Sequence, residues 1–151
     1  MCHNRTLNKQ INKIHHRALS IVYRDYTSSF DTLLEKSGSV SIHYRNIQLL
    51  AIETFKMLKK LSPSIMSENF KLKETKYEFR TGSNLQSYVP RTETYGIDSV
   101  SYLAPKIWSI IPTEIKMCEN LHTFKRLIKK WIPTSCPCRL CRTYIPNLGF
   151  I

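Results

Sequence analysis

The 151-residue sequence contains few aspartates and few glycines, and both shortages bear on catalysis. Asp25, Asp31 and Asp98 are the only aspartates and no two carboxylates are adjacent, so the chain lacks the acidic pair that holds two metal ions in a polymerase. The four glycines are isolated, which excludes the glycine-rich loops that cradle phosphates. A Cys118–His122 pair has helical spacing, but five cysteines and five histidines produce such pairs by chance. We therefore predict no catalytic residue and no enzyme activity in this chain.

Long apolar runs are also missing. A stretch such as Leu49–Ile52 is only four residues long, whereas roughly 20 are needed to cross a bilayer, so we expect no transmembrane helix. Residues 1–10 are polar and contain no apolar core of a secretory signal. We therefore expect an intracellular protein, nuclear or cytoplasmic, whose cysteines are reduced thiols or metal ligands.

Acidic residues are scarce relative to basic ones. The chain has 23 Lys and Arg against 11 Asp and Glu, a formal net charge of +12 and a sequence pI near 9.7. Such a surplus favours polyanionic partners, nucleic acid first and an anionic membrane surface second. The alternative is a basic protein whose charge only keeps it soluble.

Apolar residues recur every three or four positions in five segments, and this spacing predicts amphipathic helices. The predicted helices cover residues 7–22, 31–36, 42–61, 99–111 and 121–131. Their predicted N-caps are Ser28 or Ser29 for the second helix, Ser41 for the third and Asn120 for the last. Gly38, Ser62-Pro63 and Pro133 are the predicted stops. Pro105 lies inside the fourth segment and leaves open a kink or a later start near Ala104.

The first of these segments has an apolar side and a basic side. The apolar residues are Leu7, Ile11, Ile14, Ala18, Leu19, Ile21 and Val22. The basic residues Lys9, Lys13, Arg17 and Arg24 are predicted on the opposite side. His15 and His16 fall on the polar flank, where we interpret them as surface residues rather than ligands or bases.

Residues 71–98 have a different character, with aromatic and apolar residues spread among Thr, Ser, Asn, Gly and Pro. This pattern indicates short strands and loops. The predicted fold is mainly α: an irregular helical domain with a small hairpin or loop insert and a short Cys-rich C-terminal tail. The helical domain covers residues 1–132, with the insert at about 71–98, and the tail covers 133–151.

Basic residues are densest near the C-terminus, beyond the last acidic residue, Glu119. The predicted nucleic-acid-binding residues are Lys125, Arg126, Lys129, Lys130, Arg139 and Arg142. The first four repeat at a spacing of four, so on a helix they form one basic ridge. Such a ridge can neutralise phosphates, and Trp131, Tyr144 and Phe150 offer stacking surfaces nearby. The alternative is an ordinary solvated helix face.

Three thiols follow within six residues, at Cys136, Cys138 and Cys141. Cys138-x-x-Cys141 has the knuckle spacing that lets two sulfurs share one zinc ion, so these three cysteines are the predicted metal ligands. The fourth ligand of a tetrahedral site is missing from the run. Cys118 and His122, or Cys2 and His3, are the candidates for it. A redox-active cluster or simple packing remains an alternative.

Several segments resemble, in the same order, the tail that follows the polymerase domain in reverse transcriptases of jockey-like non-LTR retrotransposons. The resembling segments are 12–23, 26–34, 42–48, 50–53, 95–96, 99–100, 103–108, 111–112, 124–131, 136–141, 144–145 and 147–151. The resemblance implies a C-terminal piece of an RNA-directed DNA polymerase whose cysteine-bearing tail binds nucleic acid. The palm motif with paired aspartates is absent, so polymerase and endonuclease activities are not carried over.

The resulting hypothesis is a non-catalytic C-terminal fragment that binds RNA or DNA through the basic helix and the cysteine cluster, with zinc as the candidate cofactor. The expected partners are RNA or DNA and the polymerase core of a full-length element, with no membrane. One alternative is a protein interaction or scaffold module whose helices at 4–23 and 41–61 pack on that core. The other is a truncated relic with no independent function.

Overall fold

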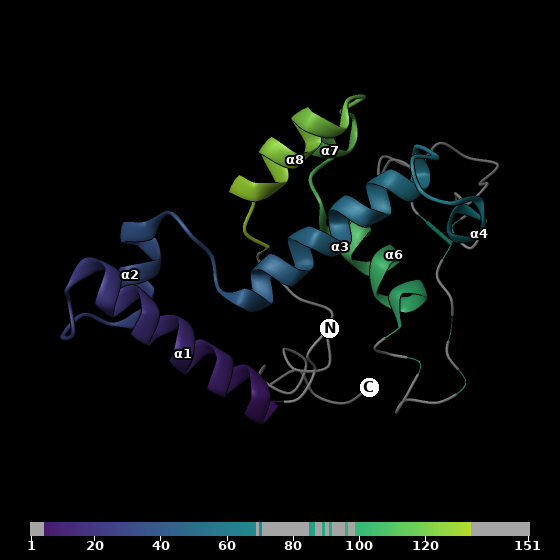
Figure 1. Ribbon diagram of the computed structural model, residues 1–151. Helices are drawn as coiled ribbons and strands as arrows, with labels where there is room; N and C mark the ends of the chain where they lie inside the picture. Colours follow the sequence, from purple (N-terminus) through teal and green to yellow (C-terminus); the bar gives the residue numbers. More distant parts are fainter. Residues whose placement is uncertain are drawn as a thin grey trace, which may run out of the picture. The chain divides into compact units, whose positions relative to one another are not determined.

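The computed structural model describes residues 5–68, 70, 85–86, 89, 91, 96 and 99–133, and it confirms a mainly α fold. Its helices are α1 (Arg5–Tyr23), α2 (Phe30–Ser37), α3 (Ile42–Leu58), α4 (Ser64–Ser67), α6 (Val100–Ile110), α7 (Thr113–Lys116) and α8 (Leu121–Lys130) (Figure 1). No strand occurs in the described part of the chain. Most of the predicted insert at 71–98, and nearly all of the tail at 133–151, lie outside the described residues.

The chain divides into two compact units, Met1–Asn46 and Ile47–Ile151. We call them the N-terminal and C-terminal units and describe each by itself. The boundary falls within the first two turns of α3. The division into residues 1–132 and 133–151 stays a prediction, because residues 134–151 lie outside the described part.

A polar turn joins α1 to α2 in the N-terminal unit, and the carboxylate of Asp25 is at its centre. Its Oδ1 accepts hydrogen bonds from the backbone N–H groups of Thr27 (3.3 Å) and Ser28 (3.0 Å). Its Oδ2 accepts from the Ser28 hydroxyl (2.7 Å) and from Lys36 Nζ on α2 (2.6 Å). Ser29 then caps α2 by accepting from Thr32 N (3.3 Å), as one of the two predicted caps. The turn thus leads from the end of α1 into the capped start of α2, and Asp25 also binds Lys36 in the last turn of α2.

The two helices pack through side chains that sequence analysis interpreted as surface polar residues. His15 and His16 are half-buried, and their rings meet the ring of Phe30 edge-on, with centroids 5.4 and 5.7 Å away. His16 Nε2 also lies 3.3 Å from the Ser28 carbonyl oxygen. The surface interpretation of these histidines is therefore wrong, because the turn after α1 brings Phe30 back over them.

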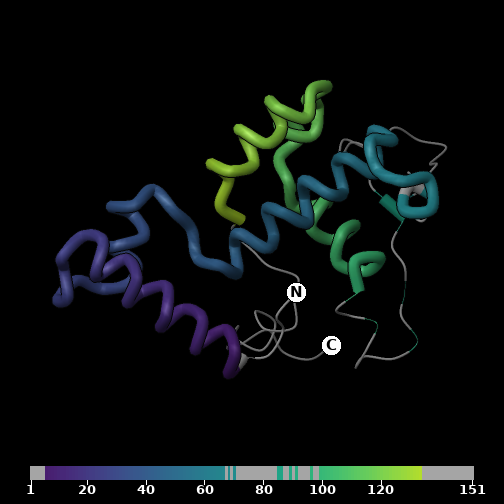
Figure 2. The backbone as a smooth tube through the Cα atoms, in the orientation of Figure 1, coloured from purple at the N-terminus to yellow at the C-terminus, as the bar shows by residue number. Residues whose placement is uncertain are grey.

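The core of the C-terminal unit is built by α3, α6 and α8. Phe55 of α3 stacks on Phe124 of α8, with ring centroids 4.2 Å apart, and the ring of Trp108 of α6 lies 6.1 Å from that of Phe124. The buried apolar residues of this unit are Ile47, Ala51, Ile52, Phe55, Met57, Leu85, Tyr102, Leu103, Ala104, Ile107, Trp108, Ile111, Phe124 and Ile128. Figure 2 follows the backbone from α6 through α7 into α8, beside α3. Phe124 therefore connects all three long helices of the unit.

The bounds of α6 agree with the predicted helix, whereas the end of α3 differs from the prediction. α6 begins at Val100 and runs through Pro105, so the helix does not start late near Ala104. α3 ends at Leu58, short of the predicted Leu61, because Lys60 adopts a left-handed conformation (φ 55°). The Leu61 N–H then donates to the Lys56 carbonyl (2.8 Å), which closes the helix end.

Candidate nucleic-acid interface

The predicted basic ridge lies on α8, whose first turn is fixed by its cap. Asn120 is the predicted N-cap, and its Oδ1 accepts a hydrogen bond from the backbone N–H of His122 (2.8 Å). The short helix α7 precedes this cap and packs against α8. The helix therefore begins at Leu121, which sets the direction of every side chain that follows.

One side of α8 is fully buried. Phe124 and Ile128 have no exposed surface, and Phe124 stacks on Phe55 of α3. Because four residues make slightly more than one turn, Phe124 and Ile128 lie one above the other and turn the same side inward. Leu121 and Leu127 are half-buried, and the side of the helix opposite Phe124 and Ile128 is left for polar side chains.

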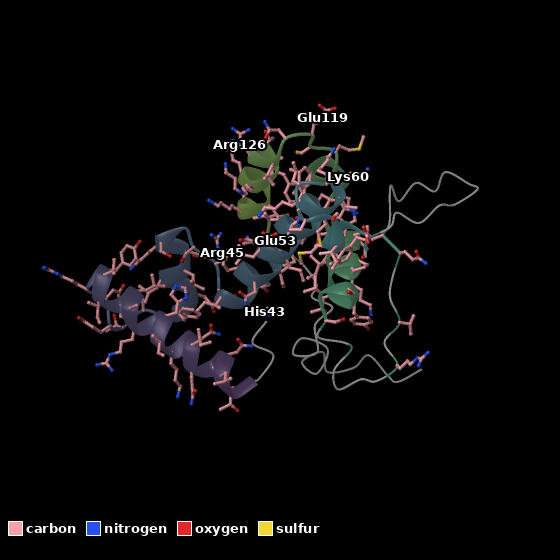
Figure 3. All side chains as sticks on the ribbon, turned by 45° about the vertical axis from the view of Figure 1, so that its right-hand side comes forward. His43, Arg45, Glu53, Lys60, Glu119 and Arg126 are labelled. Carbon is pink, nitrogen blue, oxygen red and sulfur yellow. The ribbon has the colours of Figure 1, made fainter. Side chains whose placement is uncertain are left out.

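The basic residues occupy that outer surface. Arg126, Lys129 and Lys130 are exposed and Lys125 is half-buried. They form two adjacent rows, Lys125 with Lys129 and Arg126 with Lys130, each with a spacing of four. Arg126 extends outward from α8 in Figure 3. We call Lys125, Arg126, Lys129 and Lys130 the α8 basic face.

No acidic residue neutralises this face from within the helix. The sequence from Leu121 to Lys130 contains neither Asp nor Glu. Among the described residues, the ion pairs are Lys36–Asp25 and Lys56–Glu53, and neither involves α8. Lys129 and Lys130 stand in the last turn, where a positive charge interacts favourably with the helix dipole. The four charges are therefore available to an external anion.

A buried glutamine holds the C-terminal end of α8. Gln48 of α3 is buried, and its Nε2 donates to the carbonyl oxygens of Lys129 (3.2 Å) and Trp131 (3.0 Å). Carbonyls in the last turn of a helix lack hydrogen-bond partners within the helix. Gln48 therefore supplies the missing donor to two of these carbonyls. Sequence analysis did not identify this residue. The sequence feature that could have indicated its role is its position: Gln48 is a polar residue next to Ile47 and three residues before Ala51, both of which belong to the apolar stripe of α3.

His122 is a second residue that sequence analysis did not place at this site. It is exposed and lies one turn before Lys125 and Arg126, at spacings of three and four. Its imidazole thus extends the α8 basic face toward the N-terminal end of the helix. The signal in the sequence was this spacing, whereas the sequence pattern pointed to His122 only as a partner of Cys118 or as a candidate zinc ligand.

The cysteine cluster falls outside the described residues. Arg139, Arg142 and the predicted ligands Cys136, Cys138 and Cys141 lie there, so their roles stay predictions. Within the described part, no three His, Cys, Asp or Glu side chains gather as a metal site. Cys118, a candidate fourth ligand, is half-buried and its Sγ lies 3.9 Å from the Glu114 carbonyl oxygen.

No family model, no curated protein and no solved structure matches this chain. None of the described helices combines the length and the apolar character needed to span a membrane.

Proposed function

We propose that this chain binds the phosphate backbone of RNA or DNA through the α8 basic face. The observation that carries the proposal is the arrangement of α8: its inner side is anchored by Phe124 and Ile128, and its outer side presents four cations without an acid. Because the helix is already formed and anchored, little backbone conformational freedom is lost when the cations bind a ligand.

The sequence resemblance supports a more specific form of the proposal. In that form, the chain is the non-catalytic C-terminal segment of a retrotransposon reverse transcriptase and holds template RNA or target DNA. The absence of a paired-aspartate motif in the sequence agrees with a binding role. The proposal of nucleic-acid binding rests on the α8 basic face alone. The proposal that the chain is part of a reverse transcriptase rests on the sequence resemblance.

Counterion release gives the proposal a quantitative form. A cation that contacts a phosphate displaces condensed counterions, so the logarithm of the binding constant falls linearly with the logarithm of the salt concentration. Four contacts predict a contribution to the slope of roughly −2.8 on a single strand and roughly −3.6 on duplex DNA. The basic face should therefore account for a measurable part of the salt dependence.

The test is a salt titration of the full chain with labelled RNA, single-stranded DNA and duplex DNA of one sequence, from about 50 to about 250 mM salt. The test variant replaces Lys125, Arg126, Lys129 and Lys130 with Gln. We expect the salt slope to shrink in magnitude by roughly 3 and the affinity at low salt to fall at least tenfold. Circular dichroism checks that helix content is kept. The RNA and DNA arms show which nucleic acid is preferred.

A charge-matched control removes four cations elsewhere. In this variant Arg45, Lys59, Lys60 and Arg91, which are exposed, become Gln. If net charge alone drove binding, both variants would lose the same affinity, and that result would contradict the proposal. An unchanged slope in the α8 variant, or no binding by the wild-type chain at low salt, would also contradict it.

A further inference from the structure

Helix α1 presents an apolar stripe to solvent. Leu7, Ile14, Ile21 and Val22 are 44%, 70%, 56% and 72% exposed, and Ala18 between them is also exposed. The side of α1 that meets α2 is a different one, with His15 and His16 against Phe30. The stripe predicted from the sequence therefore exists, and most of it is left exposed when α1 packs on α2.

The spacing along this stripe is that of a helix-pairing seam. Leu7, Ile11, Ile14, Ala18 and Ile21 follow one another at steps of four, three, four and three residues. These steps are the a and d positions of two heptads, the pattern by which one helix packs on another. By contrast, the apolar stripe of α3 is mostly buried within the C-terminal unit, with Ile47, Ala51 and Phe55 all covered. Of the two helices predicted to dock on a partner, α1 is the one whose apolar face is exposed.

The charges around the seam select a partner. The sequence of α1, Arg5–Tyr23, contains no Asp or Glu, and Lys9, Lys13 and Arg17 form a row at a spacing of four. Arg17 is three residues from Ile14 and four from Ile21, so it borders the seam directly. Flanking charges of this kind fix the partner of a helix pair, because opposite charges attract across the seam and like charges repel.

We propose that α1 binds an acidic amphipathic helix of another protein, seam against seam. A second copy of this chain fits less well, because it would bring two proteins of net charge +12 together. An anionic membrane surface also fits less well, since helices that lie in the interface usually carry Trp or Phe on the apolar side and this stripe has neither. Nucleic acid would pair with the cations but leave the apolar stripe uncovered. The proposal rests on α1 and is independent of the α8 basic face.

The test measures binding of the full chain to designed helical peptides of about four heptads. The first peptide has Ile and Leu at positions a and d and Glu at e and g. The second keeps the apolar positions but carries Lys at e and g, and the third keeps Glu but has Ser at a and d. We expect the first peptide to bind at least tenfold more tightly than either of the others, because it alone matches both the seam and the charge.

Variants of the exposed residues locate the binding site without disturbing a core. Ile14→Asn with Ile21→Asn should weaken binding of the first peptide at least tenfold. Val89→Asn with Met117→Asn is the matched control, because both residues are similarly exposed, at 80% and 79%, and neither is in α1. Arg17→Glu should reduce binding of the first peptide and increase binding of the second.

The remaining outcomes each decide the question. Peptide binding that survives the four Gln substitutions on α8 supports the proposal and separates it from the nucleic-acid function. Equal binding of the first and third peptides would overturn it, since charge alone would then suffice. Sedimentation that shows a dimer lost in Ile14→Asn with Ile21→Asn would assign the stripe to a second copy. Binding to phosphatidylserine vesicles lost in the same variant, without peptide binding, would assign it to a membrane.

Discussion

At the scale of single residues, Asp25 is a group whose ionisation contributes to the stability of the N-terminal unit. The hydrogen bond from the Lys36 ammonium group, followed by that from the Ser28 hydroxyl, holds the pKa of this carboxyl well below its usual range. A carboxyl with a lowered pKa stabilises the folded state at any pH above its unfolded pKa of about 3.9. As the pH falls below that value, the unfolded state takes up the proton first and this stabilisation is lost.

We therefore predict that the N-terminal unit loses stability as the pH drops below about 4 and that Asp25→Asn removes this part of the pH dependence. At neutral pH the variant should be less stable than the wild type, because Asn lacks the charge that attracts Lys36. Hydrogen exchange of the α1 and α2 amides at several pH values measures both effects. Glu35→Gln, at an exposed position of α2, is the control. Identical pH profiles for wild type and Asp25→Asn would refute the assignment.

At the scale of elements, three helices end on a left-handed residue and only one of these residues is glycine. Gly38 after α2 has φ 59°, whereas Arg24 after α1 has φ 50° and Lys60 after α3 has φ 55°. In each case the next N–H donates to a carbonyl five residues earlier, over 2.8–3.1 Å. A side chain with a Cβ pays for this conformation with steric strain of about 1–2 kcal/mol.

Lys60→Gly should accordingly stabilise the C-terminal unit, by up to about 1 kcal/mol after the greater freedom of glycine in the unfolded chain is subtracted. Urea unfolding followed by circular dichroism measures the difference. Lys60→Ala is the matched control, because it removes the same side chain but keeps the Cβ, and it should bring no such gain. A stabilisation shared by both variants would mean that the charge of Lys60, rather than its backbone, is responsible.

The elements also show what could be predicted from the sequence. Helices α1, α2, α3, α6 and α8 and the caps at Ser29, Ser41 and Asn120 were predictable, because periodicity and capping are local, whereas the four-residue helices α4 and α7 were not predicted. The end of α3 was not, since a left-handed Lys60 leaves no glycine as a signal. The buried side of α1 was not predictable either. Periodicity shows that a helix has an apolar side, but contact with Phe30 decided that the histidine side meets α2.

In the candidate site too, the local features could be predicted from the sequence and the contacts between distant residues could not. The α8 basic face depends on a spacing of four within one helix, so the sequence was sufficient to place its four cations on one helix surface. The role of Gln48 could not be predicted, because it depends on α3 lying beside the end of α8 in the folded unit. Contacts between residues some 80 positions apart have no local signature in a single sequence.

At the scale of the whole molecule, two helices are rich in positive charge but differ in how much of their apolar side is buried. α1 and α8 each carry four Lys or Arg and no acid, so eight of the 23 basic residues lie on them. On α8 the inner side is fully buried through Phe124 and Ile128, and the exposed residues are His122, Arg126, Lys129 and Lys130. On α1 the cations accompany an exposed apolar seam. The two helices therefore suit the two different partners proposed above, a phosphate backbone for α8 and an acidic helix for α1.

The two units also differ in how much apolar surface they bury, and this difference predicts unequal stability. Among the described residues, the N-terminal unit buries Leu33 and Leu34, whereas the C-terminal unit buries a core that extends through α3, α6 and α8. Because local opening costs less where few apolar side chains are buried, amides of α1 and α2 should exchange faster than those of α6 and α8. Along α3, protection should rise from the first turn, in the N-terminal unit, toward Phe55.

Paired core substitutions make this prediction specific. Leu33→Ala should cost about 2–5 kcal/mol and speed exchange in α1 and α2, while exchange in α8 stays as in the wild type. Phe124→Ala should cost about 3–5 kcal/mol and speed exchange in α6 and α8, with α1 unchanged. If either substitution sped exchange equally in all helices, the chain would unfold as one cooperative body and the division at Asn46 would have no energetic meaning. If the responses are separate, binding of an acidic helix should slow exchange in α1 and α2 but not in α8, and binding of RNA or DNA should slow it in α6 and α8 but not in α1, because each ligand stabilises only the unit that it contacts.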